Sequence, residues 1–143
     1  MNIQRSLNEV VFFLIEQTNK KAKQFSAAKF AERGIDVTVD QWVLMKVIQE
    51  NPDQSQSAIA EQTYKDAASI TRMLDLLVKK DLVYRMPIDR RQFSINLTEK
   101  GQGFIEKHMT FVQELRNIGT AGLSEEEIAG LRRILLKIQE NLK

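Results

Sequence analysis

Residues 89–98 have the sequence DRRQFSINLT, in which two arginines follow an acidic residue and precede an alternation of apolar and polar side chains. Alternation with a period of two is typical of a strand that buries one of its faces. Residues 82–86 (LVYRM) form a second, largely apolar stretch just before it. Residues 87–92 join the two stretches, so we expect a β-hairpin with Arg90 and Arg91 at its tip.

Two short helices are predicted before this hairpin. Ser55 and Ser57 can cap the first helix, and Asp66 suits the N-cap of the second, because their short side chains accept hydrogen bonds from the free N–H groups of a first helical turn. About four residues separate the helices, which is the spacing of a helix-turn-helix. The second helix has an apolar face that comprises Ile70, Met73, Leu74, Leu77 and Val78. A helix-turn-helix followed by a hairpin is a winged helix.

Further helices are predicted on the N-terminal side. The first has an apolar stripe and ends near Gly34, a residue that suits a helix C-terminus. The stripe comprises Ile3, Leu7, Val10, Leu14, Thr18, Ala22 and Phe25. Thr38 and Gln41 then form a capping box, which predicts the start of a helix that ends at Asn51.

Two helices are also predicted after the hairpin. Thr98 caps the first of them, and Gly119 and Gly122 end it. Ser124 begins a second capping box, and the last helix has a narrow apolar seam made of Ile128, Leu131, Leu135, Ile138 and Leu142. Because the chain supplies few partners for the apolar faces of its first and last helices, we expect a partner subunit to cover them.

Composition excludes several classes of protein. The 143 residues are 43% apolar and 28% charged, which is typical of a soluble globular chain. There is no cysteine, so disulfides, thiol catalysis and Cys-based metal sites are excluded, and a single histidine makes no metal cluster. No apolar run approaches the ~18 residues of a membrane span, and no signal peptide is recognisable. We therefore expect a cytoplasmic protein without cofactor or metal.

An enzyme is also not expected. The sequence has no glycine-rich phosphate loop, no nucleophile with a recognisable base and no metal-ligand spacing. The net charge is only +2, so overall charge does not identify a nucleic-acid partner. The one concentrated group of cations is Arg85, Arg90 and Arg91 in the hairpin.

In the order of its elements the chain resembles the MarR family of bacterial transcription regulators over nearly its whole length. Residues 89–91 (DRR), followed by residues 97–101 (LTEKG), look like the family's wing signature. Residues 55–60 (SQSAIA) are similar to its Thr-Gln-x-x-Leu-Ala motif, and residues 69–72 (SITR) match its Thr-Val-Thr-Arg motif. The chain departs from the family at Lys80-Asp81, where a glycine is usual.

The resemblance implies a mainly α fold with a small β-hairpin wing. Residues 35–101 would be a winged helix-turn-helix DNA-binding domain, and residues 1–34 and 102–143 would form a helical dimerisation region. It implies a homodimer that binds double-stranded DNA at a pseudo-palindromic operator, as a repressor relieved by a small aromatic or anionic effector. A winged-helix module that binds another protein, without specific DNA binding, remains the alternative because the net charge is small.

The predicted DNA contacts lie in the wing and the helix-turn-helix. By resemblance, Arg91 enters a minor groove, whose negative potential attracts arginine, while Asp89 orients it by an ion pair and Arg90 lies beside it. A solvated turn is the simpler alternative. The remaining predicted contacts are Ser55, Ser57, Lys65, Ala67, Ala68, Ser69, Thr71 and Arg72. Capping alone would also explain the two serines that begin the first of these helices.

A ligand pocket is predicted from the aromatic residues. By resemblance, a small effector would bind between the dimer helices and the winged helix. The candidate residues are Phe12, Phe13, Trp42, His108 and Phe111. Ordinary core aromatics with one partly exposed histidine are the alternative.

Overall fold

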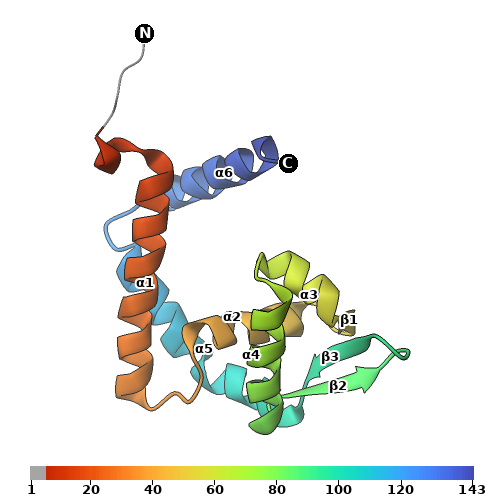
Figure 1. The fold of residues 1–143 in the computed structure, drawn as a ribbon. Coiled ribbons are helices and arrows are strands. Elements are labelled where there is room, and N and C mark those ends of the chain that lie inside the picture. Colours follow the sequence, from red (N-terminus) through yellow and green to blue (C-terminus); the bar gives the residue numbers. More distant parts are fainter. Residues whose placement is uncertain (1–5) are drawn as a thin grey trace. The chain divides into compact units, whose positions relative to one another are not determined.

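The computed structural model describes residues 6–143, and over that range it contains six α-helices, a 3-10 helix and a three-stranded antiparallel sheet (Figure 1). In chain order the elements are η1 (Leu7–Glu9), α1 (Val11–Arg33), α2 (Val39–Glu50), β1 (Gln54–Ser55), α3 (Gln56–Thr63), α4 (Ala67–Lys79), β2 (Val83–Pro87), β3 (Phe93–Leu97), α5 (Glu99–Gly119) and α6 (Glu125–Asn141). The predicted fold, mainly α with a hairpin wing, is confirmed.

The chain divides into two compact units, of which one ends at Met109 and the other comprises Thr110–Lys143. The first unit contains the helix-turn-helix and the wing, and the boundary falls within α5. The assignment of residues 35–101 to DNA binding and of the flanking residues to dimerisation stays a prediction.

The first long helix starts later than its apolar stripe predicted. Ile3 lies outside the described residues, and Leu7–Glu9 form η1. Val10 has an extended backbone (φ −81°, ψ 119°), which separates η1 from α1. The Ser6 hydroxyl donates to the Asn8 side chain (2.6 Å), and such local hydrogen bonds compete with helix formation. The prediction of an uninterrupted helix is therefore wrong at this end.

The predicted helix starts in the rest of the chain are confirmed. The Thr38 hydroxyl accepts from the Gln41 N–H (3.0 Å) and the Gln41 side chain accepts from the Thr38 N–H (3.0 Å), which completes the capping box of α2. Ser55 caps α3, Asp66 caps α4, and Ser124 begins the capping box of α6. Each cap satisfies N–H groups that a helix leaves free in its first turn.

The wing is the hairpin of β2 and β3, and β1 extends its sheet, with β3 in the centre. β1 consists only of Gln54–Ser55, which is too short to show a periodicity, so the sequence did not predict it. The Asn96 side chain of β3 adds two hydrogen bonds with Asp53, of 3.0 and 2.8 Å. Because β1 leads directly into α3, this pairing fixes the start of α3 to the wing.

One face of α4 lies at the centre of the winged-helix core. Ile70, Leu74 and Leu77 are fully buried at spacings of four and three, which is the periodicity of one helix face. The other buried apolar residues of this unit include several on α2, α3, the sheet and α5, among them Trp42, Leu44, Met45, Ile48, Ile59, Val83, Ile95 and Ile105. The opposite face of α4, which includes Ala68, is exposed.

The start of α5 is packed closely against the end of α4. The Thr98 N–H donates to the Leu82 carbonyl (3.1 Å), and the Thr98 hydroxyl accepts from the Gly101 N–H (2.9 Å), so the predicted cap is present. Gly101 lies so near this junction that a Cβ would overlap the Leu82 carbonyl oxygen. The glycine of the LTEKG segment is therefore required by backbone packing.

In the unit Thr110–Lys143, α6 buries none of its residues within the chain. The residues of its predicted seam are half-buried or exposed: Ile128, Leu131, Leu135, Ile138 and Leu142. Within residues 6–143, every helix falls short of the length and apolar character that a membrane span requires.

Helix α4 ends in a Schellman motif. The Leu82 N–H donates to the Leu77 carbonyl (3.0 Å) and the Asp81 N–H to the Val78 carbonyl (2.9 Å). Asp81 has a left-handed backbone (φ 59°), as does Gly34 beyond α1 (φ 69°). Glycine adopts this conformation without a Cβ clash, whereas aspartate does so at a cost of about 1 kcal/mol.

We expect Gly101→Ala to lower the free energy of unfolding by about 2 kcal/mol, because the backbone of Leu82 must move to admit the new methyl group. Gly103→Ala, two residues later in the same helix, is the matched control. A Cβ at Gly103 meets nothing within 4 Å, and alanine favours helix by up to about 1 kcal/mol. Urea denaturation should therefore show opposite signs, and equal effects of the two changes would contradict the close packing.

Replacing Asp81 by glycine should raise the free energy of unfolding by about 0.5–1 kcal/mol, since it relieves the left-handed backbone. Thermal unfolding of Asp81→Gly and Asp81→Ala would measure this. Alanine removes the same carboxylate but keeps the Cβ, so it should not stabilise. Equal stabilisation by both would assign the effect to charge.

Candidate nucleic-acid interface

A groove of ≈ 470 Å³ lies between α3, α4 and the wing. It is lined by Gln56, Ser57, Ala60, Ala67, Ile70, Thr71, Asp75, Arg85, Arg91, Gln92 and Phe93. Four of the predicted contact residues, from α3, α4 and the wing, therefore share one concave surface, although they are far apart in the sequence. They are Ser57, Ala67, Thr71 and Arg91.

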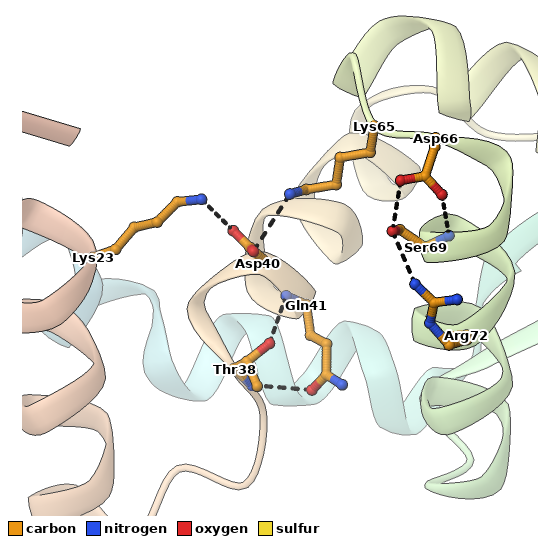
Figure 2. A network of polar contacts seen from close by, with 8 residues as sticks. All are labelled: Lys23, Thr38, Asp40, Gln41, Lys65, Asp66, Ser69 and Arg72. Carbon is orange, nitrogen blue, oxygen red and sulfur yellow. Dashed lines mark hydrogen bonds and ion pairs between the residues drawn. The ribbon is translucent and has the colours of Figure 1, made fainter. Parts of the chain in front are cut away.

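Polar side chains form a chain of contacts along the first turns of α4 (Figure 2). The Asp66 carboxylate accepts from the Ser69 N–H (2.8 Å) and hydroxyl (2.9 Å), and the Ser69 hydroxyl oxygen accepts from Nη2 of Arg72 (3.1 Å). The hydrogen bonds from Ser69, together with the charge of Arg72, lower the pKa of Asp66. This arrangement holds the Arg72 guanidinium along the exposed face of the helix.

Helices α3 and α4 are joined by a direct side-chain contact. The Gln56 amide nitrogen donates to the Thr71 hydroxyl (2.8 Å), which donates to the Ala67 carbonyl (2.9 Å). The Ser55 hydroxyl accepts from the Ala58 N–H (3.2 Å), so its role within the chain is capping. Gln56 was not among the predicted site residues, although its place in the SQSAIA segment could have indicated it.

The turn of the wing is held by Asp89. Its carboxylate accepts from the backbone N–H groups of Arg91 (2.8 Å) and Gln92 (3.0 Å), which is an Asx turn. Among the described residues, the ion pairs do not include the one predicted between Asp89 and the Arg91 guanidinium. Asp89 therefore orients Arg91 through its backbone, and the side chains of Arg90 and Arg91 are exposed.

Arg85 belongs to a different part of the wing from the two tip arginines. Its Nη2 is 2.7 Å from Oδ1 of Asp75 on α4, and its side chain is largely buried, with 22% exposed. The ion pair ties β2 to α4 and so fixes the angle of the wing. Asp75 belongs to no recognisable motif, so this contact was not predicted from the sequence.

Lys65 points away from the exposed face of α4. Its Nζ lies 3.4 Å from Oδ2 of Asp40, and Nζ of Lys23 lies 3.0 Å from Oδ1 of the same carboxylate (Figure 2). Partial burial raises the pKa of Asp40, but the two lysines lower it by more, so the net pKa is below the usual value. Lys65 as a direct DNA contact stays a prediction.

The residues of the predicted ligand pocket lie in different surroundings. Trp42 is buried, with its ring 6.4 Å from that of Phe30 and 6.3 Å from that of Phe104. His108 is half-buried and stacks edge-on against Phe104 at 4.6 Å.

The three other candidate residues for this pocket differ in exposure and in the unit to which they belong. Phe12 is exposed on the first turn of α1, next to the half-buried Phe13, and Phe111 belongs to the other compact unit. In the described part of the chain, no three acidic or histidine side chains gather as they would to hold a metal ion. The pocket stays a prediction.

Comparison with known proteins extends these observations. Residues 37–93 match the model of the MarR family. The fold is similar to a mutant MarR from E. coli complexed with operator DNA, at a TM-score of 0.81 and 27% identity over 94% of this chain and 99% of that one.

Two further structures are similar over nearly the whole length. For the transcriptional regulator SlyA the TM-score is 0.81 and the identity 25%, over 92% of this chain and 93% of that one. For a probable transcriptional regulator from Pseudomonas aeruginosa the values are 0.78 and 26%, over 93% and 99%. The similarity therefore includes the helices that flank the winged helix.

Burial lowers the pKa of His108, and the charges of Lys107 and Arg33 lower it further. The unfolded chain consequently binds a proton near pH 6.5 that the folded chain does not bind until lower pH. Stability is then constant above that pH and falls as the pH drops through it. We expect urea unfolding to show lower stability at about pH 5.5 than at about pH 7.5. His108→Phe, which keeps an aromatic ring, should reduce the difference, and an undiminished difference would assign it to other groups.

Proposed function

Since the chain is a MarR-family protein, matched to the family in its winged helix and to MarR structures over nearly its whole length, we propose that it is a homodimeric, sequence-specific DNA-binding regulator. Its family consists of transcription regulators and not of enzymes. We further propose that it represses transcription and that a small ligand relieves the repression. Acting on the chromosome, it would work in the cytoplasm.

The observation that carries this proposal is the groove between α3, α4 and the wing. Its walls bring the start of α4, the Gln56–Thr71 contact and Arg91 onto one surface. In helix-turn-helix proteins the first turns of the second helix read base edges in the major groove. Small side chains at Ala67 and Ala68 would let the α4 backbone approach the bases closely.

The wing supplies the second point of contact in this proposal. Arg90 and Arg91 are exposed at its tip, while Arg85 is paired with Asp75 and anchors its base. The tip would reach the minor groove or the phosphates beside the half-site. A narrow minor groove attracts arginine because its negative potential is enhanced.

Exposed apolar residues support the proposed homodimer. Phe12 and Leu14 on α1 are exposed, and so are Leu131 and Leu136 on α6. Exposed apolar side chains on these helices would be covered in a dimer interface. A two-fold dimer places its recognition helices one DNA turn apart, about 34–36 Å, so the operator would be pseudo-palindromic.

Relief of repression requires a ligand that binds one dimer geometry better than another. A small aromatic or anionic molecule near His108 and Phe104 would suffice if it favoured misplaced recognition helices. Coupling of this kind is typically about 1–3 kcal/mol.

One observation favours a second candidate function. Met86 and Ile88 of the wing are both 55% exposed, and apolar side chains at a hairpin tip also suit a protein partner. A winged-helix protein-interaction module would bind without releasing counterions, so its affinity would depend little on salt.

We expect the purified protein to bind a fluorescent duplex taken from the region upstream of its own gene, measured by anisotropy from about 50 to 200 mM salt. Arg91→Ala should weaken binding by about 1–3 kcal/mol, the range of a good contact. Arg91→Lys keeps the charge but lacks the planar guanidinium, so it should recover only part of the loss.

An unrelated duplex of the same length serves as the specificity control. Equal binding to both duplexes would mean that the protein does not recognise the sequence of the upstream duplex. Binding without any salt slope, even to unrelated DNA, would favour the protein-interaction module.

A further inference from the structure

Asp40, in the first turn of α2, contacts two lysines from distant parts of the chain. Lys23 reaches it from α1, with Nζ 3.0 Å from Oδ1, and Lys65 reaches it from the turn between α3 and α4, with Nζ 3.4 Å from Oδ2. Figure 2 shows the Asp40 carboxylate between the ammonium groups of Lys23 and Lys65. A single carboxylate therefore joins α1 to the turn that leads into α4.

A surface pocket lies on each side of Asp40. A cavity of ≈ 360 Å³ between α1 and α2 is lined by Lys23, Phe30 and Asp40 among others. A second cavity of ≈ 220 Å³ between α2, α3 and α4 is lined by Asp40, Lys65 and Met73 among others. The two ion pairs therefore join α1 to α2, and α2 to the turn before α4, beside these two pockets.

The turn that includes Lys65 has an unfavourable backbone conformation at the preceding residue. Tyr64 has a left-handed backbone (φ 55°) without being a glycine, and its side chain is 92% exposed. A non-glycine residue in this region costs about 1–2 kcal/mol. The turn therefore needs contacts from elsewhere to hold it, and the ion pair of the next residue with Asp40 is such a contact.

The stability of these ion pairs alone is modest. The three side chains are between 32% and 44% exposed, and exposed pairs each contribute only about 0–1 kcal/mol. A shared carboxylate makes the two pairs interdependent, however, because Lys23 and Lys65 approach different oxygens of one group. The lowered pKa of Asp40 agrees with this, since both lysines favour the ionised form of the carboxyl against the opposing effect of partial burial.

We propose that Asp40 is a positioning residue for DNA binding: through Lys65 it holds the turn in front of α4, and through Lys23 it makes that position depend on α1. The inference rests on the proposed DNA-binding function. Lys65 then serves DNA binding from within the protein and not by contact with a phosphate. A displacement of α1 would be transmitted to the recognition helix by two ion pairs.

Simple electrostatics and this proposal predict opposite signs for one substitution. Asp40→Asn removes a negative charge and releases Lys65, so if Lys65 were a phosphate contact, affinity for DNA would rise. The proposal expects affinity for the upstream duplex to fall, about 2- to 30-fold, with an unchanged salt slope. Lys65→Met should weaken binding without reducing the slope by the unit that a phosphate contact contributes.

The link to α1 is tested with Lys23→Met and its matched control Lys20→Met. Lys20 lies one turn earlier on α1 and also pairs with a carboxylate, that of Glu16 in the same helix at 3.2 Å. Amide hydrogen exchange should become faster in residues 63–70 in Lys23→Met and Asp40→Asn. Exchange there should be unchanged in Lys20→Met.

The two measurements separate the possible failures. Unchanged exchange in residues 63–70 in Lys23→Met would overturn the link, whether or not the protein binds DNA. Faster exchange with equal or tighter DNA binding by Asp40→Asn would overturn its role in DNA binding. A wild-type protein that binds no DNA would refute the proposed function, and the exchange result would still decide the coupling. The double variant Lys23→Met/Asp40→Asn completes the test. If its loss of affinity equals the sum of the losses in the two single variants, the two residues act separately and the proposed link is wrong.

Discussion

The burial of one face of α4 is the constraint on which the rest of the structure depends. Ile70, Leu74 and Leu77 are completely removed from water, and burying side chains of this size stabilises a fold by about 1.5–3 kcal/mol each. A helix that buries these positions must turn Thr71 and Arg72 outward, because they lie on another face. The exposed surface of the recognition helix is therefore a consequence of apolar packing.

Acidic side chains determine which cations remain available on the surface. Arg85 belongs to the same cationic group in the sequence as Arg91, yet Asp75 holds it against α4. Lys65 lies just before the recognition helix, yet Asp40 directs it toward α2. The tip of the wing keeps its exposed arginines because Asp89 binds the backbone of the turn. Net charge says little about this protein, since local pairing decides which charges can meet a partner.

Local signals predicted most of the fold. The capping box of Thr38 and Gln41, the caps of Ser55 and Asp66, and the alternation in β3 each involve residues close in sequence, so a short segment contains the whole interaction. The start of α1 was misjudged because its apolar stripe continues through residues where local hydrogen bonds compete with the helix. β1 escaped prediction because a two-residue strand has no period.

The sequence by itself thus determined the order of the elements, the ends of most helices and the candidate contacts in α4 and the wing. Only the tertiary structure decided which of these residues share a surface. It placed Arg91 in one groove with Thr71 and separated Lys65 from them. It also showed why Gly101 is needed, since its neighbour is the backbone of Leu82, which lies between α4 and β2. Pairings of this kind join positions far apart in the chain, and residue spacing contains no information about which distant partner packing will bring near.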